Sequence, residues 1–369
     1  MKALYVATVV KTHINTFHIP YLKMLKSMGY ETFVAAKNDF ENPEECDIPH
    51  CDNYYDIHFE RNPFHPRNIK AYKELKEIIQ TQHFDIIHCH TPVGGALSRL
   101  AARKERKRGT KVFYTAHGFH FYKGAPVINW LLYYPVERTL ARLTDVLITI
   151  NREDYKTAQP FKAKRKEYIP GVGIDTAQFS SHKIEKPLFK KSLGLPVDSM
   201  VLLSVGELNN NKNHSIVIKA LKNIPDCYYV ICGEGPLKDE LRRLATDLKI
   251  EDRVILTGYT ANVRDYYKMA DYFVFPSHRE GLPVALMEAM ASGLPCIASR
   301  NRGTKELLPN SKLLFNADNK EELINKLNSA IKENQTAEKE TNLNTIKGYD
   351  LKTTLKKMKE LYLEEVEYE

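Results

Sequence analysis

Residues 272–298 read YFVFPSHREGLPVALMEAMASGLPCIA, and this stretch decides the fold. It begins and ends with short apolar runs, Tyr272–Phe275 and Cys296–Ala298, and a helical pattern lies between them. Pro283 suits the first turn of that helix, and Gly293 suits its C-terminal cap. Fully apolar strands separated by helices are typical of parallel sheets that helices cover on both faces.

The same alternation extends toward both ends of the chain. In the first half we expect strands at Leu4–Thr8, Thr32–Ala36, Asp85–Cys89, Lys111–Ala116 and Val146–Ile150. In the second half, further strands are expected at Val201–Val205, Tyr228–Cys232 and Val254–Thr257. Helical patterns run from Thr16 to Met28, after Pro66, from Val93 to Lys107 and from Ile128 to Leu143. The sequence therefore predicts an α/β protein of two Rossmann-like domains, whose parallel sheets face a cleft between them.

The length and the turn residues indicate where the domains meet. A chain of 369 residues exceeds what one hydrophobic core usually serves. A proline and two glycines in Ile169–Asp175 mark a boundary, so we expect residues 1–175 to form the first domain and residues 176–349 the second. Residues 350–369 carry an apolar helical stripe that needs a partner, and we expect this helix to pack back on the first domain. The stripe consists of Leu351, Leu355, Met358 and Tyr362.

Composition excludes several classes of protein. The chain is 43% hydrophobic and 27% charged, which is typical of a soluble globular protein, and no apolar run is long enough to cross a membrane. Six cysteines are scattered without a C-x-x-C pair, which favours reduced thiols in a cytosol. Cys46, Cys51 and His50 could hold a metal ion, although loop cysteines are the simpler interpretation.

The net charge of +8 is placed unevenly, because all of the basic excess precedes Ile169-Pro170. It is densest between Arg99 and Lys166, and such a patch attracts nucleic acid or anionic lipid headgroups. Since no nucleic-acid-binding motif accompanies it, an anionic membrane or lipid-linked substrate is the expected partner, and a solvated helix face is the alternative. The closely spaced bases are Arg103, Lys104, Arg106, Lys107, Arg108 and Lys111.

Two glutamates flank the start of the helix in the opening segment. Glu280 precedes this helix, and Glu288 lies inside it among apolar residues, where a carboxylate is costly unless something hydrogen-bonds to it. A hydroxyl-rich ligand is one such partner and a core arginine is another. The N–H groups of Gly281 and Leu282 lie at the helix N-terminus, which favours phosphate. A ligand with hydroxyl groups at one end and phosphate at the other would suit this segment, and a nucleotide sugar is such a ligand.

Two other loops of the same domain also follow strands. Lys212 lies in the loop that begins at Gly206, and it can reach a diphosphate as a point charge. The run Gly233-Glu234-Gly235-Pro236 is a tight glycine turn that opens the next helix. Ligands of parallel sheets bind beyond the carboxyl ends of the strands, so these loops are expected to form one site.

Histidines follow two strands of the first domain. His117 comes directly after Lys111–Ala116, and His88 and His90 end the preceding strand. A histidine at the cleft can hydrogen-bond to a sugar hydroxyl or a phosphate without a metal. A zinc site of His88, His90 and His117 is the alternative.

These motifs resemble the retaining nucleotide-sugar glycosyltransferases of the family 4 type, which have the GT-B architecture. Glu280 and Glu288 reproduce an E-x7-E motif followed by Gly-Leu-Pro, and the Gly233–Pro236 turn also matches. The resemblance extends to Asp85–His90 and Thr115–Gly118, so it covers nearly the whole chain. The run Thr115–Gly124, with Gly206–Asn209 and Lys212–His214, is similar to the bacterial capsule and exopolysaccharide branch.

The resemblance implies a role for each matching position. Glu280, Lys212 and His117 would be the catalytic residues: Glu280 beside the donor sugar, Lys212 on the leaving diphosphate and His117 on the sugar from across the cleft. Glu288 would accept hydrogen bonds from the ribose, and Tyr259 would lie near the base. The other donor-binding residues would be Gly281, Leu282, Gly206, Glu207, Asn209, Gly233 and Gly235.

The sequence departs from the family pattern at two loops. Glu207 stands where many members carry arginine, so either it faces away from the diphosphate or Lys212 and the neighbouring asparagines act instead. The first-domain loop Thr8–His13 lacks the usual paired glycines. Lys11, His13 and His90 are therefore the candidates for binding the acceptor.

The implied activity is a metal-independent, retaining transfer without a cofactor. The donor would be a UDP-sugar, of an N-acetylhexosamine type, and the acceptor a saccharide on an undecaprenyl-diphosphate-type lipid, in capsule or exopolysaccharide synthesis. The protein would be cytoplasmic and peripheral at the inner face of the membrane, with no nucleic-acid partner. Aromatics between Phe119 and Tyr134 would contribute to the membrane-facing surface. A UDP-N-acetylhexosamine 2-epimerase and a non-catalytic sugar-nucleotide-binding subunit are the alternative functions.

Overall fold

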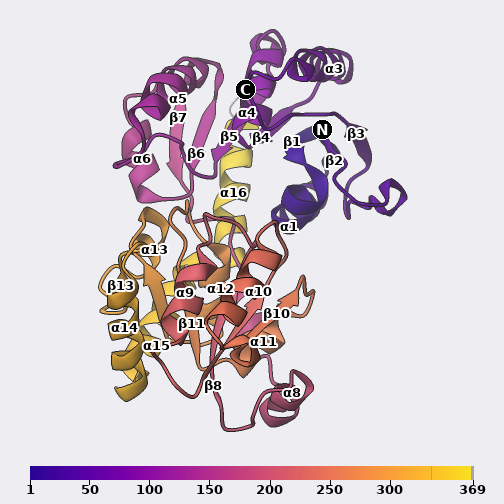
Figure 1. The fold of residues 1–369 in the computed structure, drawn as a ribbon. Coiled ribbons are helices and arrows are strands. Elements are labelled where there is room, and N and C mark those ends of the chain that lie inside the picture. The colour runs from indigo at the N-terminus through magenta and orange to yellow at the C-terminus, as the bar shows by residue number, and fades with distance from the viewer. Residues whose placement is uncertain (334, 367–369) are drawn as a thin grey trace. The chain divides into compact units, whose positions relative to one another are not determined.

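The computed structural model describes residues 1–333 and 335–366, which divide into two compact units (Figure 1). Unit 1 comprises Met1–Gly173 together with the chain from Lys352 onward, and unit 2 comprises Ile174–Leu351. Each unit has a parallel sheet covered by helices.

The sheet of unit 1 has seven parallel strands in the order β3-β2-β1-β4-β5-β6-β7. Successive strands run outward from β1 to β3, and the chain then returns to place β4 on the other side of β1. A ligand site is expected beyond the carboxyl ends of β1 and β4, where the strand order reverses. The strands are β1 (Lys2–Val9), β2 (Glu31–Lys37), β3 (Asn53–Asp56), β4 (Ile86–His90), β5 (Lys111–Ala116), β6 (Val146–Thr149) and β7 (Arg165–Tyr168).

Helices cover both faces of this sheet. They are α1 (Asn15–Phe17), α2 (Ile19–Ser27), α3 (Arg67–Gln82), α4 (Pro92–Ala101), α5 (Val127–Leu140), α6 (Arg152–Ala158) and most of α16 (Leu351–Val366). A π-helical turn, Val10–Ile14, joins β1 to α1, and short 3₁₀ turns occur at Pro43–Glu45, Glu105–Arg108 and Ala141–Leu143.

Unit 2 repeats the topology with six parallel strands in the order β10-β9-β8-β11-β12-β13. Its reversal point lies between β8 and β11. The strands are β8 (Met200–Val205), β9 (Cys227–Cys232), β10 (Val254–Gly258), β11 (Tyr272–Phe275), β12 (Cys296–Ser299) and β13 (Leu314–Phe315). The helices are α7 (Thr176–Ser180), α8 (Lys186–Ser192), α9 (His214–Leu221), α10 (Lys238–Asp247), α11 (Val263–Met269), α12 (Val284–Ala291), α13 (Arg302–Leu307), α14 (Lys320–Lys332) and α15 (Thr336–Ile346), with 3₁₀ turns at Glu251–Arg253 and Lys347–Tyr349.

The predicted fold class, two Rossmann-like domains with parallel sheets, is confirmed, but three strands and two helix breaks were missed. The helix expected from Val93 to Lys107 ends at Ala101, and a 3₁₀ turn follows at Glu105–Arg108. β3, β7 and β13 are edge strands, and the first two are polar and only partly buried, so they lack the apolar runs of the central strands. The helix expected from Thr16 to Met28 is interrupted at His18. Pro20 explains this break, because proline has no N–H to continue a helix through the preceding turn.

The apolar stripe of α16 finds its partner on the sheet of unit 1. Met358 and Tyr362 are buried in the same core cluster as Tyr5 of β1, and the Tyr362 hydroxyl lies 2.7 Å from the hydroxyl of Tyr5. Tyr362 also hydrogen-bonds to Nδ1 of His88 in β4. Residues 367–369 of the predicted helix lie outside the described residues. Among the described helices, none is both long and apolar enough to span a bilayer.

Candidate functional site

Two loops of unit 2 meet beyond the carboxyl ends of β8 and β11, where the strand order reverses. The Nζ atom of Lys212 lies 2.7 Å from Oε1 of Glu280, and their side chains are 22% and 14% exposed. The Lys212 ammonium also lies 5.2 Å from the ring centre of Phe275, the last residue of β11. Two of the predicted catalytic residues therefore form one ion pair, close to the surface and over the end of the sheet.

Asparagines hold the Lys212 loop in place. The Asn209 side-chain oxygen accepts a hydrogen bond from the Lys212 N–H at 3.0 Å. The Asn211 amide donates to the carbonyl of Arg279, and the Asn211 carbonyl accepts from the N–H of His278. These contacts tie the loop after β8 to the loop after β11 and so orient the ion pair. Asn209, expected to bind the donor, makes a contact within its own loop.

The glycines of unit 2 permit backbone segments to approach each other closely. A Cβ atom on Gly233 would lie 1.9 Å from the carbonyl oxygen of Gly206, and one on Gly235 would lie 2.6 Å from that of Leu208. The Leu208 N–H donates to the Glu234 carbonyl at 2.9 Å, which joins the loops after β8 and β9. Larger side chains would separate these loops.

The N-terminus of α12 lies next to the ion pair in the chain. No side chain caps this helix, whose N-cap residue is Pro283. The Arg302 guanidinium donates to the carbonyl of Glu280 at 3.2 Å, so α13 supports the turn that precedes α12. Gly303 packs closely as well, because a Cβ atom there would lie 2.8 Å from the carbonyl oxygen of Gly281. Arg302 and Gly303 were missed, since neither belongs to a recognised motif. At the other end of α12, Gly293 provides the predicted left-handed cap with φ +80°.

Glu288 finds a hydroxyl partner within the protein. The Tyr267 hydroxyl donates to Oε2 of Glu288 at 2.9 Å. Burial disfavours the charged carboxylate and raises the pKa of Glu288 to about 7, and the hydrogen bond from Tyr267 partly opposes this shift. The partner of Glu288 within the protein is thus a tyrosine of α11 and not the core arginine that was the alternative. Glu288 as a whole residue is partly exposed.

Other predicted donor residues differ in exposure. Tyr259 is 80% exposed, directly after Gly258 at the end of β10, and the side chain of Glu207 is exposed too. Leu282 is buried at 8% exposure, so only its backbone is a candidate for ligand contact. Gly258 was not among the predicted residues, yet its φ of +77° and its proximity to Glu234 make it the residue that permits this turn.

Four histidines gather at the carboxyl ends of the central strands of unit 1. The His13 and His18 Nε2 atoms are 3.2 Å apart, and so are Nδ1 of His90 and Nε2 of His117. One ring nitrogen of each histidine lies within 4.8 Å of one ring nitrogen of every other. His18 was missed because it occupies the helix break, which the sequence pattern does not show.

The environment keeps this histidine group neutral. Burial and repulsion among the rings lower the pKa of His13, His18 and His90 well below the ordinary value, and burial lowers that of His117 to about 4. His88 lies beside the group but uses both ring nitrogens elsewhere. Its Nδ1 pairs with Tyr362 and its Nε2 lies 2.8 Å from the Thr115 hydroxyl. His88 is therefore not available as a ligand of the zinc site that the sequence offered as an alternative, whereas His90 and His117 belong to the histidine group. Cys46, Cys51 and His50 do not form a metal-binding group within the described part of the chain.

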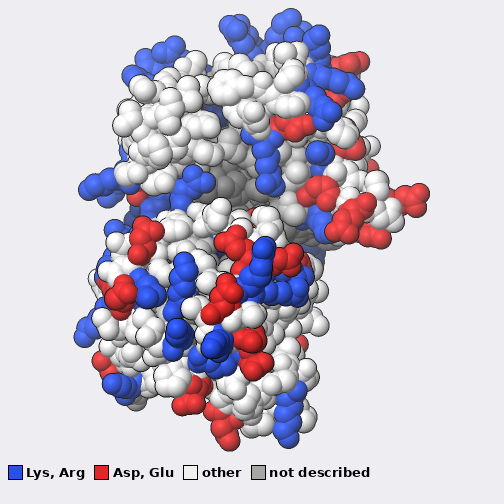
Figure 2. Space-filling view, viewed as in Figure 1, with Lys and Arg blue, Asp and Glu red and all other residues white. Residues whose placement is uncertain are grey.

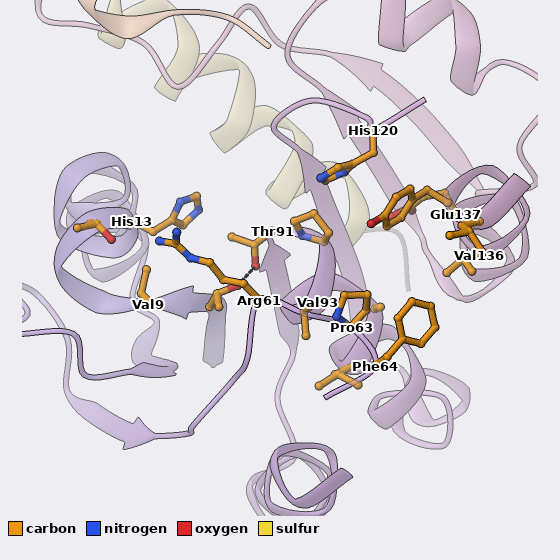
Figure 3. A pocket seen from close by; sticks show the side chains of 17 residues that line it. Val9, His13, Arg61, Pro63, Phe64, Thr91, Val93, His120, Val136 and Glu137 are labelled. Atoms are coloured by element: carbon orange, nitrogen blue, oxygen red, sulfur yellow. Dashed lines mark hydrogen bonds between the residues drawn. The ribbon is translucent and has the colours of Figure 1, made fainter. Parts of the chain in front are cut away.

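A cavity of about 470 Å³ lies in unit 1 beside this histidine group (Figure 3). His13 and Arg61 lie together at one side of it, while Phe64, Val93 and Val136 form an apolar side (Figure 3). Within the described residues, no acidic side chain pairs with Arg61. Of the predicted acceptor residues, only His13 lines the cavity; Lys11 lies over the ring of Phe40, and His90 is 2% exposed. Arg61 was missed because an isolated arginine in a loop gives no signal.

The basic region between Arg99 and Lys166 is partly structural. Arg99 is fully buried, pairs with Glu137 at 2.9 Å and stacks on the ring of Tyr114. Arg106 pairs with Asp145 at 2.8 Å. Arg99 and Arg106 therefore do not contribute free charge to the expected cationic patch, because Glu137 and Asp145 neutralise them.

Most of the aromatic side chains that were expected at a membrane-facing surface belong to the hydrophobic core instead. Phe119 and Phe121 are buried, and Trp130, Tyr133 and Tyr134 pack against the same cluster. The exposed apolar side chains lie instead on the other side of α5, and the surface over α5 is largely uncharged in Figure 2. They are Val127, Ile128, Leu131, Leu132 and Val136.

Two family models match successive parts of the chain. Residues 21–178 match the model described as Glycosyltransferase Family 4, and residues 185–346 match the model described as Glycosyl transferases group 1. Together they cover most of both units.

Bacterial relatives match over most of their length. The Bacillus subtilis (strain 168) protein named "Putative glycosyltransferase EpsD" is 42% identical over 314 residues, which are 83% of this chain and 81% of the relative. The Escherichia coli "UDP-Gal:alpha-D-GlcNAc-diphosphoundecaprenol alpha-1,3-galactosyltransferase" is 31% identical over 324 residues, 81% of this chain and 82% of the relative.

Solved structures share the fold at low sequence identity. Sucrose-phosphate synthase from Thermosynechococcus elongatus has a TM-score of 0.79 at 18% identity, covering 99% of this chain and 98% of the other. Anabaena HepE in complex with UDP and glucose has a TM-score of 0.79 at 20% identity, covering 98% of this chain and 99% of the other.

Proposed function

Because this chain belongs to the group 1 and family 4 glycosyltransferases, we propose that it transfers a sugar from a UDP-sugar to a lipid-linked saccharide with retention of configuration. The sugar is of the N-acetylhexosamine type, the acceptor lipid is of the undecaprenyl-diphosphate type, and the product enters capsule or exopolysaccharide synthesis. The observation that carries the proposal is the Lys212–Glu280 ion pair at the reversal point of unit 2, next to the uncapped N-terminus of α12.

The donor site combines groups suited to the two parts of a nucleotide sugar. Lys212 and the N–H groups at the start of α12 offer positive potential for a diphosphate. Glu280 and Glu288 offer carboxylate oxygens for hydroxyl groups of the sugar and the ribose. Before the donor arrives, Lys212 and Tyr267 occupy these carboxylates. Donor binding then exchanges protein partners for ligand partners, so the buried charges remain paired throughout.

The chemical step requires stabilisation of a leaving diphosphate. As the bond between the anomeric carbon and the diphosphate breaks, negative charge grows on the leaving oxygens, and positive groups held in place lower the energy of that state. Asn209 holds the backbone of Lys212, so the ammonium stays at the site when it exchanges Glu280 for the diphosphate. In this proposal no metal ion is needed for the departure of the diphosphate.

The acceptor is proposed to bind unit 1. The Escherichia coli relative is named for an acceptor with an N-acetylglucosamine on diphosphoundecaprenol, and a Campylobacter jejuni relative is likewise named for a diphospho-undecaprenol acceptor. The cavity beside His13 suits such an acceptor. Arg61 would bind the diphosphate, and the apolar side of the cavity would contact the first part of the lipid. This assignment replaces Lys11 with Arg61 as the cation of the acceptor site.

The exposed apolar side of α5 is proposed to enter the surface of an anionic membrane, at the cytoplasmic face, where a peripheral enzyme meets its lipid-linked acceptor. Exposed bases at Lys123, Arg138 and Arg142 adjoin it in the chain and would be attracted to lipid headgroups. Co-sedimentation with vesicles of phosphatidylglycerol tests this role. Leu131→Asp should reduce binding, whereas Leu188→Asp, a change at an exposed leucine of unit 2, should not. Equal binding of both variants would remove the membrane role of α5.

The donor is tested by a thermal-shift screen of UDP-, GDP- and ADP-sugars. A ligand that binds only the native state raises the unfolding temperature, so UDP-sugars should give the largest increase. The increase should disappear in Lys212→Ala and persist in Lys222→Ala, an exposed lysine at the end of α9. A larger shift with a GDP- or ADP-sugar would contradict the UDP assignment.

A further inference from the structure

The four histidines of unit 1 form a compact group that the transfer reaction does not require as a whole. They come from three separate places in the chain: His13 and His18 from the segment after β1, His90 from the end of β4, and His117 from the loop after β5. The rings of His18 and His90 have centroids 4.0 Å apart, and those of His13 and His117 are 5.0 Å apart. The fold therefore brings eight imidazole nitrogens into one small volume.

Hydrogen bonding within the protein does not account for this arrangement. His90 is 2% exposed, and its Nε2 atom has no hydrogen-bond partner among the described residues. An unpartnered buried polar atom costs about 1–3 kcal/mol. The two pairs that do form are between imidazoles, so each pair leaves other ring nitrogens unused. A ligand that accepts lone pairs from several imidazoles at once would satisfy the group.

The spacing matches a tetrahedral metal site. Zinc binds histidine nitrogen at about 2.0–2.1 Å, which places two ligands of a tetrahedron about 3.3 Å apart. The Nε2 atoms of His13 and His18 lie 3.2 Å apart, and one ring nitrogen of each histidine lies within 4.8 Å of one ring nitrogen of every other. Small rotations of the rings would bring the remaining distances into range.

We propose that His13, His18, His90 and His117 bind one divalent transition-metal ion, with zinc as the best match. Neutral imidazoles are good ligands for zinc, and a set without thiolate or carboxylate leaves the site with the full charge of the ion. His18 and His90 are buried, whereas His13 and His117 are half-buried, so the ion enters from the side of the latter pair. The site goes beyond the proposed transfer reaction and lies wholly in unit 1.

The ion would fix the segment after β1 to the ends of β4 and β5. This segment contains the π-helical turn Val10–Ile14 and the helix break at His18, where regular helical hydrogen bonding is interrupted. Because His13 also lines the cavity with Arg61, the metal would hold one wall of that cavity in position. The ion thus has a positioning role, separate from the donor residues of unit 2.

The test is metal analysis of the untagged full-length protein. After removal of metal with a chelator and dialysis, the protein is titrated with ZnCl₂ in a calorimeter, and Co²⁺ replaces zinc for visible spectroscopy. The expected result is one equivalent of zinc per chain and the intense absorption of tetrahedral Co²⁺. His18→Gln and His90→Gln should each lower zinc affinity at least tenfold, while the exposed control His58→Gln should bind as the parent does.

Two readouts keep the test independent of folding defects and of transferase activity. Zinc should raise the unfolding temperature of the unaltered protein, and a chelator should reverse the increase. Lys212→Ala, which impairs the proposed donor site, should still bind one equivalent. The proposal is overturned if the folded, unaltered protein binds no zinc at micromolar concentration, or if the histidine variants bind it as tightly as the parent.

Discussion

The Lys212 ammonium lies 2.7 Å from Oε1 of Glu280, which joins the loops after β8 and β11 at the reversal point of the unit 2 sheet. An ion pair in this position is neutral before the donor binds. A diphosphate must therefore attract Lys212 away from Glu280, and the freed carboxylate becomes an acceptor for sugar hydroxyls. The two residues should respond differently to substitution.

Glu280→Gln should separate binding from turnover. Removing the charge of Glu280 leaves Lys212 without a competing carboxylate, so UDP should bind as tightly as before or more tightly, while turnover falls by about 10²-fold or more because a group near the reacting sugar is lost. Calorimetry with UDP and steady-state kinetics measure the two effects.

Lys212→Ala should instead weaken UDP binding by at least tenfold, since a charged hydrogen bond contributes about 1.5–3 kcal/mol. Parallel losses of UDP affinity in both variants would contradict the exchange of partners.

Glu288 should make the stability of unit 2 depend on pH. Its folded pKa of about 7 lies above the ordinary value of 4.5, so burial favours the protonated form. The stabilisation is present below about pH 4.5 and is lost as the pH rises through 7. Glu288→Gln keeps a neutral acceptor for Tyr267 and should be more stable than the parent at pH 8, by about 1–3 kcal/mol, with little difference at pH 5. Denaturant unfolding at the two pH values measures this, and an equal difference at both would show that the carboxyl group is not responsible.

Gly233→Ala should disrupt the joint between the loops after β8 and β9. The added methyl group would lie 1.9 Å from the Gly206 carbonyl oxygen, and the backbone must move to relieve the overlap. We expect a loss of stability of about 1–3 kcal/mol, together with weaker UDP binding. Gly348→Ala is the matched control, because a methyl group there has no neighbour within 4 Å, and its unfolding temperature should be nearly unchanged. A stable, UDP-binding Gly233→Ala protein would refute the close approach.

Tyr362→Phe should loosen the contact of α16 with the sheet of unit 1. The Tyr362 hydroxyl is buried between Tyr5 and His88, so its removal leaves two buried polar groups short of a partner. The expected cost is about 1–3 kcal/mol in thermal or denaturant unfolding. Tyr259→Phe, at an 80% exposed position, should have no measurable effect. Equal stability of the two variants would mean that the buried hydroxyl contributes nothing.

Much of the fold could be predicted because central parallel strands are continuous apolar runs. Tyr272–Phe275 and Lys111–Ala116 have the same bounds in the sequence pattern and in the structure. Polar edge strands could not be found in this way, since β7 has the sequence RKEY and gains its hydrogen bonds from β6. The break at His18 depends on how the chain packs after β1, which no local pattern records.

The site could be predicted only where a motif fixes a position. Glu280 and Lys212 stand in such motifs, and the fold brings them together. Arg61 and His18 carry no local signal, and they join their groups only through tertiary contacts. The burial of Arg99 could not be predicted for the same reason, because its partner Glu137 lies 38 residues further along the chain.

The most direct measurement of the central claim is UDP release from UDP-sugars with and without a synthetic saccharide on a polyprenyl diphosphate. The account predicts that UDP appears only when the acceptor is present, that the acceptor gains one sugar in the α-configuration retained from the donor, and that Lys212→Ala lowers the rate by 10²-fold or more. Formation of an epimer from UDP-N-acetylhexosamine alone, or no reaction with any acceptor while UDP-sugar still binds, would contradict it.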